Sequence, residues 1–235
     1  QTLQGTGAAN LFDLTGIVGP TGLALIDGLG GNDTITGSAL SDVINGGDGD
    51  DLLSGGDGFD VINGGNDNDT INGGLHDDTI NGGVGIDTIN AGDGFDVIQV
   101  SGAESEFDSI NGGNNTDVIV AIGGPAIILD SFNSLTNSIE SWAGNGFSIQ
   151  GNGNANTLNF QLVGTMSGVP FIDGGSGNDT ITGTNGVDEL RGGDGDDVLI
   201  GLGGTDTLRG GANNDSLNGG DGIDSLYGDA GLDTI

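Results

Sequence analysis

Seventeen aspartates recur along this chain in one sequence setting, and their spacing suits the binding of a cation by oxygen atoms. Each is followed two residues later by Ile or Leu, and most lie nine residues apart in a glycine-rich frame. Counted from its first glycine, the repeat has Asp in sixth place and the apolar residue in eighth place, and six copies read G-G-x-G-x-D without deviation. Carboxylates and backbone carbonyls in a flexible, glycine-shaped turn form a hard oxygen cage that suits Ca²⁺. The pattern therefore predicts a series of calcium sites.

The candidate metal ligands are the carboxylates in sixth place. They are Asp33, Asp42, Asp51, Asp60, Asp69, Asp78, Asp87, Asp96, Asp108, Asp117, Asp179, Asp188, Asp197, Asp206, Asp215, Asp224 and Asp233. Zinc and copper would require Cys or His ligands, and the chain has no cysteine and one histidine. Mg²⁺ prefers a tight octahedral site, so calcium is the expected ion.

The composition shows that the chain needs such an ion. It has 35 acidic and 2 basic residues, a net charge of −33, and 53 glycines among 235 residues. A free chain of this kind is expected to be expanded, because repulsion and glycine entropy outweigh one Ile or Leu in every nine residues. We therefore expect folding and metal binding to be one event.

Tight turns and short strands must position these carboxylates. Glycine in first, second and fourth place permits positive φ. Where fourth-place glycine is missing, four of the five replacements tolerate the left-handed region, and Leu40 does not. The replacements are Leu40, Asp67, His76, Asn115 and Asn213. The residues after each turn are β-branched and alternating, as in Thr-Ile-Thr and Val-Ile-Asn, which predicts short strands.

A single repeat cannot form a core, so the repeats must stack. Two nine-residue units on opposite sides make one coil, and each coil adds about one strand spacing of ~4.8 Å. The eighth-place residues then point inward, and repeat n lies against repeat n+2. This predicts an all-β, right-handed parallel β-roll or β-helix solenoid with Ca²⁺ in the turns. One ion between each n and n+2 turn gives about thirteen, which would reduce the net charge from −33 to −7.

Two octapeptides carry a resemblance to a known family. Gly46-Gly47-Asp48-Gly49-Asp50-Asp51-Leu52-Leu53 and Gly174-Gly175-Ser176-Gly177-Asn178-Asp179-Thr180-Ile181 resemble the RTX, or haemolysin-type, calcium-binding nonapeptide. The resemblance implies a parallel β-roll, type I export from Gram-negative bacteria, and ordering in extracellular calcium. It also implies carbonyl ligands in first, second and fourth place. In the undeviating repeats these are Gly46, Gly47, Gly49, Gly55, Gly56, Gly58, Gly82, Gly83, Gly85, Gly174, Gly175, Gly177, Gly192, Gly193, Gly195, Gly219, Gly220 and Gly222. Beside the weak repeat 37–42, where Leu40 should resist the turn, we expect poor or absent metal binding.

The repeats form two tracts, 28–120 and 174–235, and a shift of 146 residues superimposes the second on the first. Residues 1–27 are expected to be the end of a metal-free β-helical connector, and 121–173 a complete one. Asn10 and Asn156 stand there in place of Asp, and we expect Trp142 in the core. A short amphipathic helix over 130–141 is the alternative for part of the connector. The duplication leads us to expect a longer parent array.

The sequence contains no motif for catalysis. It lacks H-E-x-x-H and G-x-S-x-G, and His76 fills a turn position, so we expect no enzyme. We expect a calcium-stiffened structural segment of a large secreted protein, in a surface layer, adhesin stalk or filament. The alternative is an accessory module of a secreted enzyme. An ice-binding roll would need regular outward Thr and Asn rows, and third and fifth places vary too much for that.

Localisation and partners follow from charge and calcium. Cytosolic calcium would not saturate these sites, so we expect an extracellular or cell-surface location. The negative charge disfavours nucleic acid, and there is no apolar run for membrane insertion. The expected partners are further copies or neighbouring repeats, with calcium-bridged acidic polysaccharide as another. An outward column of Val43, Val61, Val97 and Val118, together with Phe59 and Phe95, could support lateral packing. Arg191 and Arg209, in line with Tyr227, are expected to relieve negative charge near Glu189, with a recognition stripe as the alternative.

Overall fold

The computed structural model describes residues 2–16, 25–101, 108–124, 126–129 and 131–235, without the side chains of 131, 133, 135 and 136. The chain divides into two compact units, Gln1–Val120 and Ala121–Ile235. Regular structure in the described parts is β apart from one helical turn, α1 (Ser134–Asn137). Within these ranges no helix is long and apolar enough to cross a membrane.

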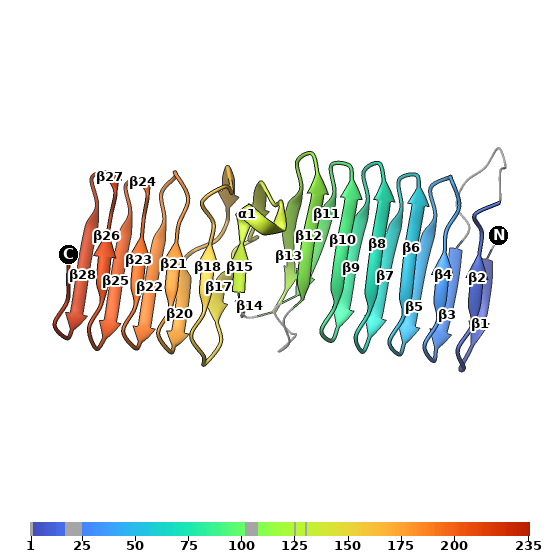
Figure 1. Ribbon diagram of the computed structural model, residues 1–235, viewed down its shortest axis with the longest axis horizontal. Coiled ribbons are helices and arrows are strands. Elements are labelled where there is room, and N and C mark those ends of the chain that lie inside the picture. The colour runs from blue at the N-terminus through green and yellow to red at the C-terminus, as the bar shows by residue number, and fades with distance from the viewer. Residues whose placement is uncertain (1, 17–24, 102–107, 125, 130) are drawn as a thin grey trace. The chain divides into compact units, whose positions relative to one another are not determined.

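The first unit is built from short parallel strands that alternate between two sheets (Figure 1). One sheet has the order β1-β3-β5-β7-β9-β11-β13 and the other β12-β10-β8-β6-β4-β2. The strands are β1 (Thr2–Thr6), β2 (Leu11–Asp13), β3 (Leu25–Gly30), β4 (Thr34–Thr36), β5 (Val43–Asp48), β6 (Leu52–Asp57), β7 (Val61–Asn66), β8 (Thr70–Leu75), β9 (Thr79–Val84), β10 (Thr88–Asp93), β11 (Val97–Ser101), β12 (Ser109–Asn114) and β13 (Val118–Gly123).

The second unit repeats this arrangement. Two of its sheets have the orders β14-β17-β20-β22-β25-β28 and β15-β18-β21-β23-β26. In addition, β16 pairs with β19, and β24 pairs with β27. The strands are β14 (Ala126–Leu129), β15 (Ser131–Asn133), β16 (Ser141–Ala143), β17 (Ser148–Gly151), β18 (Thr157–Asn159), β19 (Thr165–Ser167), β20 (Ile172–Ser176), β21 (Thr180–Thr182), β22 (Glu189–Asp194), β23 (Val198–Ile200), β24 (Gly203–Gly204), β25 (Thr207–Ala212), β26 (Ser216–Asn218), β27 (Asp221–Gly222) and β28 (Ser225–Ala230).

The pairing register is eighteen residues, or two repeats, in the repeat tracts. β5 pairs with β7 so that Val43 faces Val61 and Ile44 faces Ile62, and β7 pairs with β9 in the same way. Each nine-residue unit therefore contributes a strand to one sheet and then crosses to the other. This confirms the predicted parallel β-solenoid, in which repeat n lies against repeat n+2.

Stacked eighth-place side chains form the core between the sheets. Ile44, Ile62 and Ile80 lie one above another, each no more than 1 % exposed. Fifteen of the seventeen eighth-place residues are buried, whereas Leu226 is half-buried and Ile235 is exposed. Since each repeat contributes one such side chain, the core exists only through stacking.

Coils outside the repeat tracts are wider. Thr2 pairs with Leu25, 23 residues away, and Ser131 pairs with Thr157, 26 residues away. The wider interior of the second unit is filled by aromatic rings, since Phe132 and Phe160 stack at 4.8 Å between ring centroids and Trp142 meets both edge-on. Trp142 is buried, as the sequence predicts.

The alternative of a helix over 130–141 is correct only for Ser134–Asn137. The residues before it form β15 and those after it lead into β16, so pairing with neighbouring coils prevails over the helical pattern. Asp130 lies outside the described residues.

Shortening one side chain of the core ladder should destabilise the roll. Ile62→Ala is expected to lower the free energy of unfolding in calcium by about 2–5 kcal/mol, because it leaves a cavity between Ile44 and Ile80. Val61→Ala on the outer face, where the side chain is 47 % exposed, should cost less than about 1 kcal/mol. Denaturant unfolding at fixed calcium measures both, and equal losses would contradict the proposed core.

Candidate metal sites

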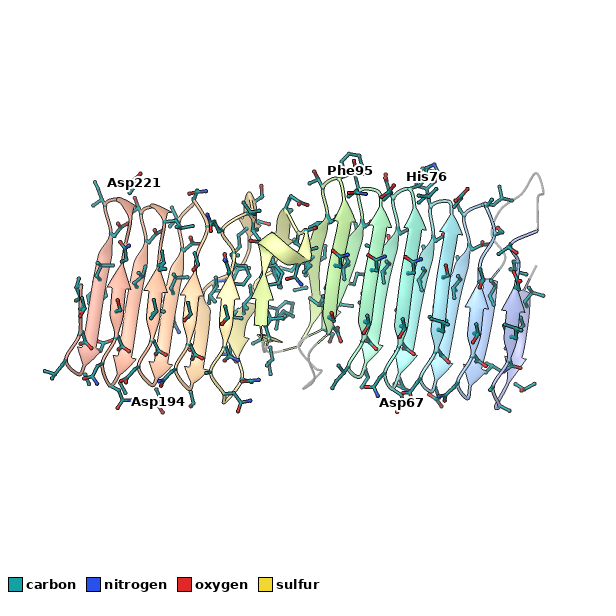
Figure 2. The ribbon with its side chains drawn as sticks, in the orientation of Figure 1. Asp67, His76, Phe95, Asp194 and Asp221 are labelled. Atoms are coloured by element: carbon teal, nitrogen blue, oxygen red, sulfur yellow. The ribbon has the colours of Figure 1, made fainter. Side chains whose placement is uncertain are left out.

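Most turns between strands adopt the left-handed conformation that the glycine pattern predicts in second and fourth place. The four tolerant fourth-place residues all have positive φ: 74° at Asp67, 79° at His76, 81° at Asn115 and 78° at Asn213. Figure 2 shows Asp67 and His76 at opposite edges of the first unit, because successive turns alternate between edges. His76 thus has a conformational role, and its ring packs near Phe59 at 5.6 Å between centroids.

First-place glycine serves a different purpose from the one expected. Gly28, Gly46 and Gly64 do not have positive φ. A Cβ on Gly28 would collide with the Oδ2 atom of Asp33 in its own turn and with the carbonyl oxygen of Gly46 in the turn two repeats later. Glycine is therefore required in first place because two oxygen atoms occupy the space of a side chain.

The sixth-place aspartates are joined in pairs along each edge of the roll. The backbone N–H of each aspartate donates to the Oδ1 atom of the aspartate two repeats later, as from Asp51 to Asp69 at 2.8 Å and from Asp60 to Asp78 at 2.8 Å. Thirteen such pairs occur among the described residues, at 2.7–3.0 Å. These are the neighbours n and n+2 that the sequence predicts to share an ion.

The second carboxylate oxygen has no such partner in most turns. Leaving aside Asp117, which has a further interaction, eleven sixth-place aspartates have a buried Oδ2 atom without a hydrogen bond. They are Asp33, Asp51, Asp60, Asp69, Asp78, Asp87, Asp96, Asp179, Asp197, Asp206 and Asp215. A buried carboxylate oxygen without a partner is costly, so these eleven atoms require a proton or a cation.

Burial also changes the acidity of these groups. It raises the pKa of Asp69 and of Asp78 from the ordinary value of 3.8 to about 7, and the pKa of Asp51 and of Asp60 to about 6. The amide hydrogen bond opposes the shift in pKa, and neighbouring carboxylates add to it. The charged form of these carboxyls is therefore less favourable than that of a free aspartate unless a cation accompanies it.

Side chains alone would not enclose an ion. Among the described residues there is no group of three or more His, Cys, Asp or Glu side chains that could hold a metal. An ion beside these aspartates would take its remaining ligands from the backbone, whose carbonyls are stacked closely at the turns. A Cβ on Gly65, for example, would collide with the carbonyl oxygen of Gly47 in the turn two repeats earlier. Carboxylate and carbonyl oxygens together are the donor set that calcium prefers, so the residues fit the predicted ion.

Of the predicted ligands, three aspartates are less enclosed. Asp108, Asp224 and Asp233 are intermediate in exposure, whereas the other fourteen are no more than 7 % exposed. All six undeviating glycine turns lie in the described residues, with positive φ at Gly47, Gly49, Gly56, Gly58, Gly83, Gly85, Gly175, Gly177, Gly193, Gly195, Gly220 and Gly222. The structure thus brings each aspartate to its predicted turn.

Two turns differ from the rest, and the sequence interpretation missed the reason. The Oδ2 atom of Asp42 accepts hydrogen bonds from the backbone N–H and the hydroxyl of Ser38, at 2.7 and 2.9 Å. Thr184 donates to the Oδ2 atom of Asp188 in the same way, at 2.8 and 3.1 Å. A hydroxyl residue in second place is the signal that could have revealed this.

The connector turns contain asparagine at the matching place. The backbone N–H of Asn10 donates to the Oδ1 atom of Asp33, and that of Asn156 to the Oδ1 atom of Asp179, at 2.6 and 2.7 Å. Each asparagine therefore holds the same position as a repeat aspartate but brings no charge to it.

The two arginines contact acidic and aromatic neighbours. Arg191 pairs with Glu189 at 2.6 Å and lies over the ring of Phe171, at 3.7 Å from its centroid. Arg209 lies 4.5 Å from the centroid of Tyr227 and 3.9 Å from an Asp229 oxygen. These contacts agree with the local charge relief that the sequence predicts.

Comparison with known proteins supports the same interpretation of the turns. The model of the RTX calcium-binding nonapeptide repeat matches residues 27–62, 54–89, 81–102, 173–208 and 209–235, which together make up more than half of the chain. The comparison with curated proteins found no match. Since the matched residues are the stacked turns and strands described above, this chain belongs to the RTX calcium-binding nonapeptide repeat family.

Proposed function

We propose that this chain is a calcium-stiffened structural segment of a large secreted protein, with a place in a surface layer, an adhesin stalk or an extracellular filament. The observation that carries the proposal is the series of eleven buried Oδ2 atoms without hydrogen bonds. Because these atoms recur in nearly every turn, the need for a cation is distributed along both units. Calcium would then act on the order and stiffness of the whole chain.

The outside of the cell supplies the ion that this proposal requires. Extracellular calcium is abundant enough to fill sites of ordinary affinity, whereas cytosolic calcium is not. With its net charge of −33, the calcium-free chain would stay extended during export and become ordered afterwards. Type I secretion, which is typical of RTX proteins, agrees with this sequence of events.

We also propose that outward columns mediate contacts between copies. In the first unit Val43 and Val61 are adjacent on one face, and the Nδ2 atom of Asn63 donates to the Oδ1 atom of Asn45 at 2.8 Å. Phe59 and Phe95 are 58 % and 62 % exposed at one turn edge, where Figure 2 shows Phe95 beside the labelled His76. The Val and Asn neighbours lie at strand spacing, whereas Phe59 and Phe95 are two coils apart, with Asp77 in the turn between them. We propose that these outward side chains pack against the same side chains of another copy. Calcium-bridged acidic polysaccharide is the other partner we propose.

Removal of calcium should unfold the chain. In EDTA the far-ultraviolet circular dichroism is expected to be that of a coil, and millimolar Ca²⁺ should restore the β signal. As controls, NaCl of equal ionic strength should not restore it, because screening leaves the Oδ2 atoms without ligands, and Mg²⁺ should act weakly. A β spectrum that persists after complete removal of metal would contradict the coupling.

Acid should partly replace calcium. A carboxyl whose pKa is raised on folding destabilises the fold above that pKa, and the penalty vanishes below the unfolded value. Since Asp69 and Asp78 have pKa values of about 7, and Asp51 and Asp60 of about 6, against 3.8, the EDTA-treated chain should gain β structure as pH falls from 8 to 5. Replacing Asp48 and Asp194 by Asn, two exposed residues that do not contribute to the pKa shifts of these four groups, provides a control for general charge and should leave this transition near its original pH. Loss of β structure on acidification over this range would show that the sign is wrong.

The structural role can be tested on material from cells. Antibody labelling with electron microscopy should place the chain in extracellular fibres or sheets that separate when calcium is chelated and reform when it returns. Intracellular labelling would contradict the proposed location. Labelled extracellular material without fibres or sheets, together with catalytic activity in the parent chain, would favour the accessory-module alternative.

A further inference from the structure

The turns 37–42 and 183–188 occupy the same place in the two halves of the duplication, 146 residues apart. In both, second place has a hydroxyl residue, Ser38 or Thr184. That hydroxyl also accepts a backbone N–H from fourth place, from Leu40 at 3.2 Å and from Gly186 at 2.9 Å. Each turn is thus closed by hydrogen bonds of its own, and we call this arrangement the hydroxyl clasp.

The clasp satisfies the atom that would otherwise face a cation. Among the first members of the thirteen aspartate pairs, eleven have an Oδ2 atom without a hydrogen bond, and the two exceptions are Asp42 and Asp188. Their Oδ2 atoms each accept a backbone N–H and a hydroxyl. A cation at these turns would have to displace both donors, so the local demand for positive charge is already met.

The backbone at the clasp is also different. Elsewhere second place is left-handed even without glycine, with φ of 75° at Leu29 and 76° at Leu202. Ser38 and Thr184 do not have positive φ, and neither do Leu40 and Gly186 in fourth place. Because Gly186 could adopt positive φ freely, Leu40 cannot be the common cause of the altered turn. The hydroxyl residue in second place is the feature that both turns share.

Both clasps stand at the start of a row of turns. The backbone N–H of Asp42 donates to the Oδ1 atom of Asp60. The same bond then joins Asp60 to Asp78 and Asp78 to Asp96 along one edge of the first unit. Asp188 donates to Asp206 in the same way in the second unit. On the opposite edge the rows follow Asn10 and Asn156, which are uncharged. Each row in the described residues thus begins with a turn that does not need a metal ion.

We propose that Ser38 and Thr184 terminate the calcium rows, so that no ion binds at the Asp42–Asp60 and Asp188–Asp206 pairs and the hydroxyl clasp takes its place. The proposal changes the expected number of ions from thirteen to eleven. It depends on calcium binding by the remaining turns but not on the structural role proposed for the chain. The sequence analysis predicts poor metal binding beside Leu40. The proposal attributes it to Ser38 instead and predicts the same at the turn of Thr184.

The second unit provides the cleaner test, because Gly186 is already glycine. In the full chain at saturating calcium, Asp188→Asn should leave the number of bound ions unchanged, whereas Asp197→Asn, a matched change in a turn without a clasp, should lose at least one. Equilibrium dialysis with elemental analysis counts the ions. Loss of an ion in Asp188→Asn equal to that in Asp197→Asn would overturn the proposal.

A gain of binding gives the converse test. Thr184→Gly removes the hydroxyl and permits the left-handed conformation, so it should bind one more ion than the parent chain. Thr182→Gly, a similar change in β21 outside the turn, is the control and should gain none. An unchanged ion count in a Thr184→Gly protein with a normal β spectrum would overturn the proposal. Should that variant not fold, the comparison of Asp188→Asn with Asp197→Asn decides the matter alone.

Discussion

A buried carboxylate in nearly every turn is the constraint on which this structure depends. In thirteen turns the Oδ1 atom of the aspartate accepts a hydrogen bond from the backbone N–H of the aspartate two repeats earlier, which supports the register between coils. In eleven turns the Oδ2 atom lies inside the turn, in most of them against first-place glycine, buried from solvent and without a hydrogen bond from the protein. The same side chain thus locks adjacent coils together and creates a need for positive charge. Because each repeat contributes only one core residue, the core forms only when coils stack, and stacking also buries the carboxylates. Stacking and charge neutralisation must therefore occur together.

The chain meets this need in three chemical ways. In eleven turns the Oδ2 atom has no hydrogen bond, and a hard cation with carbonyl ligands suits it. In two turns Ser38 or Thr184 donates two hydrogen bonds instead. In the connector turns Asn10 and Asn156 keep the backbone bond and bring no charge. The hydrogen bonds from backbone N–H groups to Oδ1 atoms of the next coil occur in all three kinds of turn. The solenoid can therefore continue through turns that do not bind a metal ion.

The fold could be predicted from the sequence because the same pattern of glycine turn, aspartate and inward Ile or Leu occurs seventeen times. Stacking of n on n+2, the inward Ile and Leu ladder, and left-handed Asp67, His76, Asn115 and Asn213 all follow from position in the repeat. The reason for first-place glycine did not follow, because crowding by oxygens of another turn is visible only in three dimensions. The effect of Ser38 was assigned to Leu40 for a similar reason: one sequence cannot show which of two deviations forms the hydrogen bonds.

Anomalous X-ray diffraction from crystals grown in calcium is the most direct test of the central claim, that cations between stacked turns neutralise the buried carboxylates. The account predicts anomalous peaks within coordination distance of the Oδ2 atoms of turns such as those of Asp51, Asp69 and Asp197, with backbone carbonyls completing each site. A well-ordered roll in which these oxygen atoms contact only protein groups or water, without a metal peak, would contradict it.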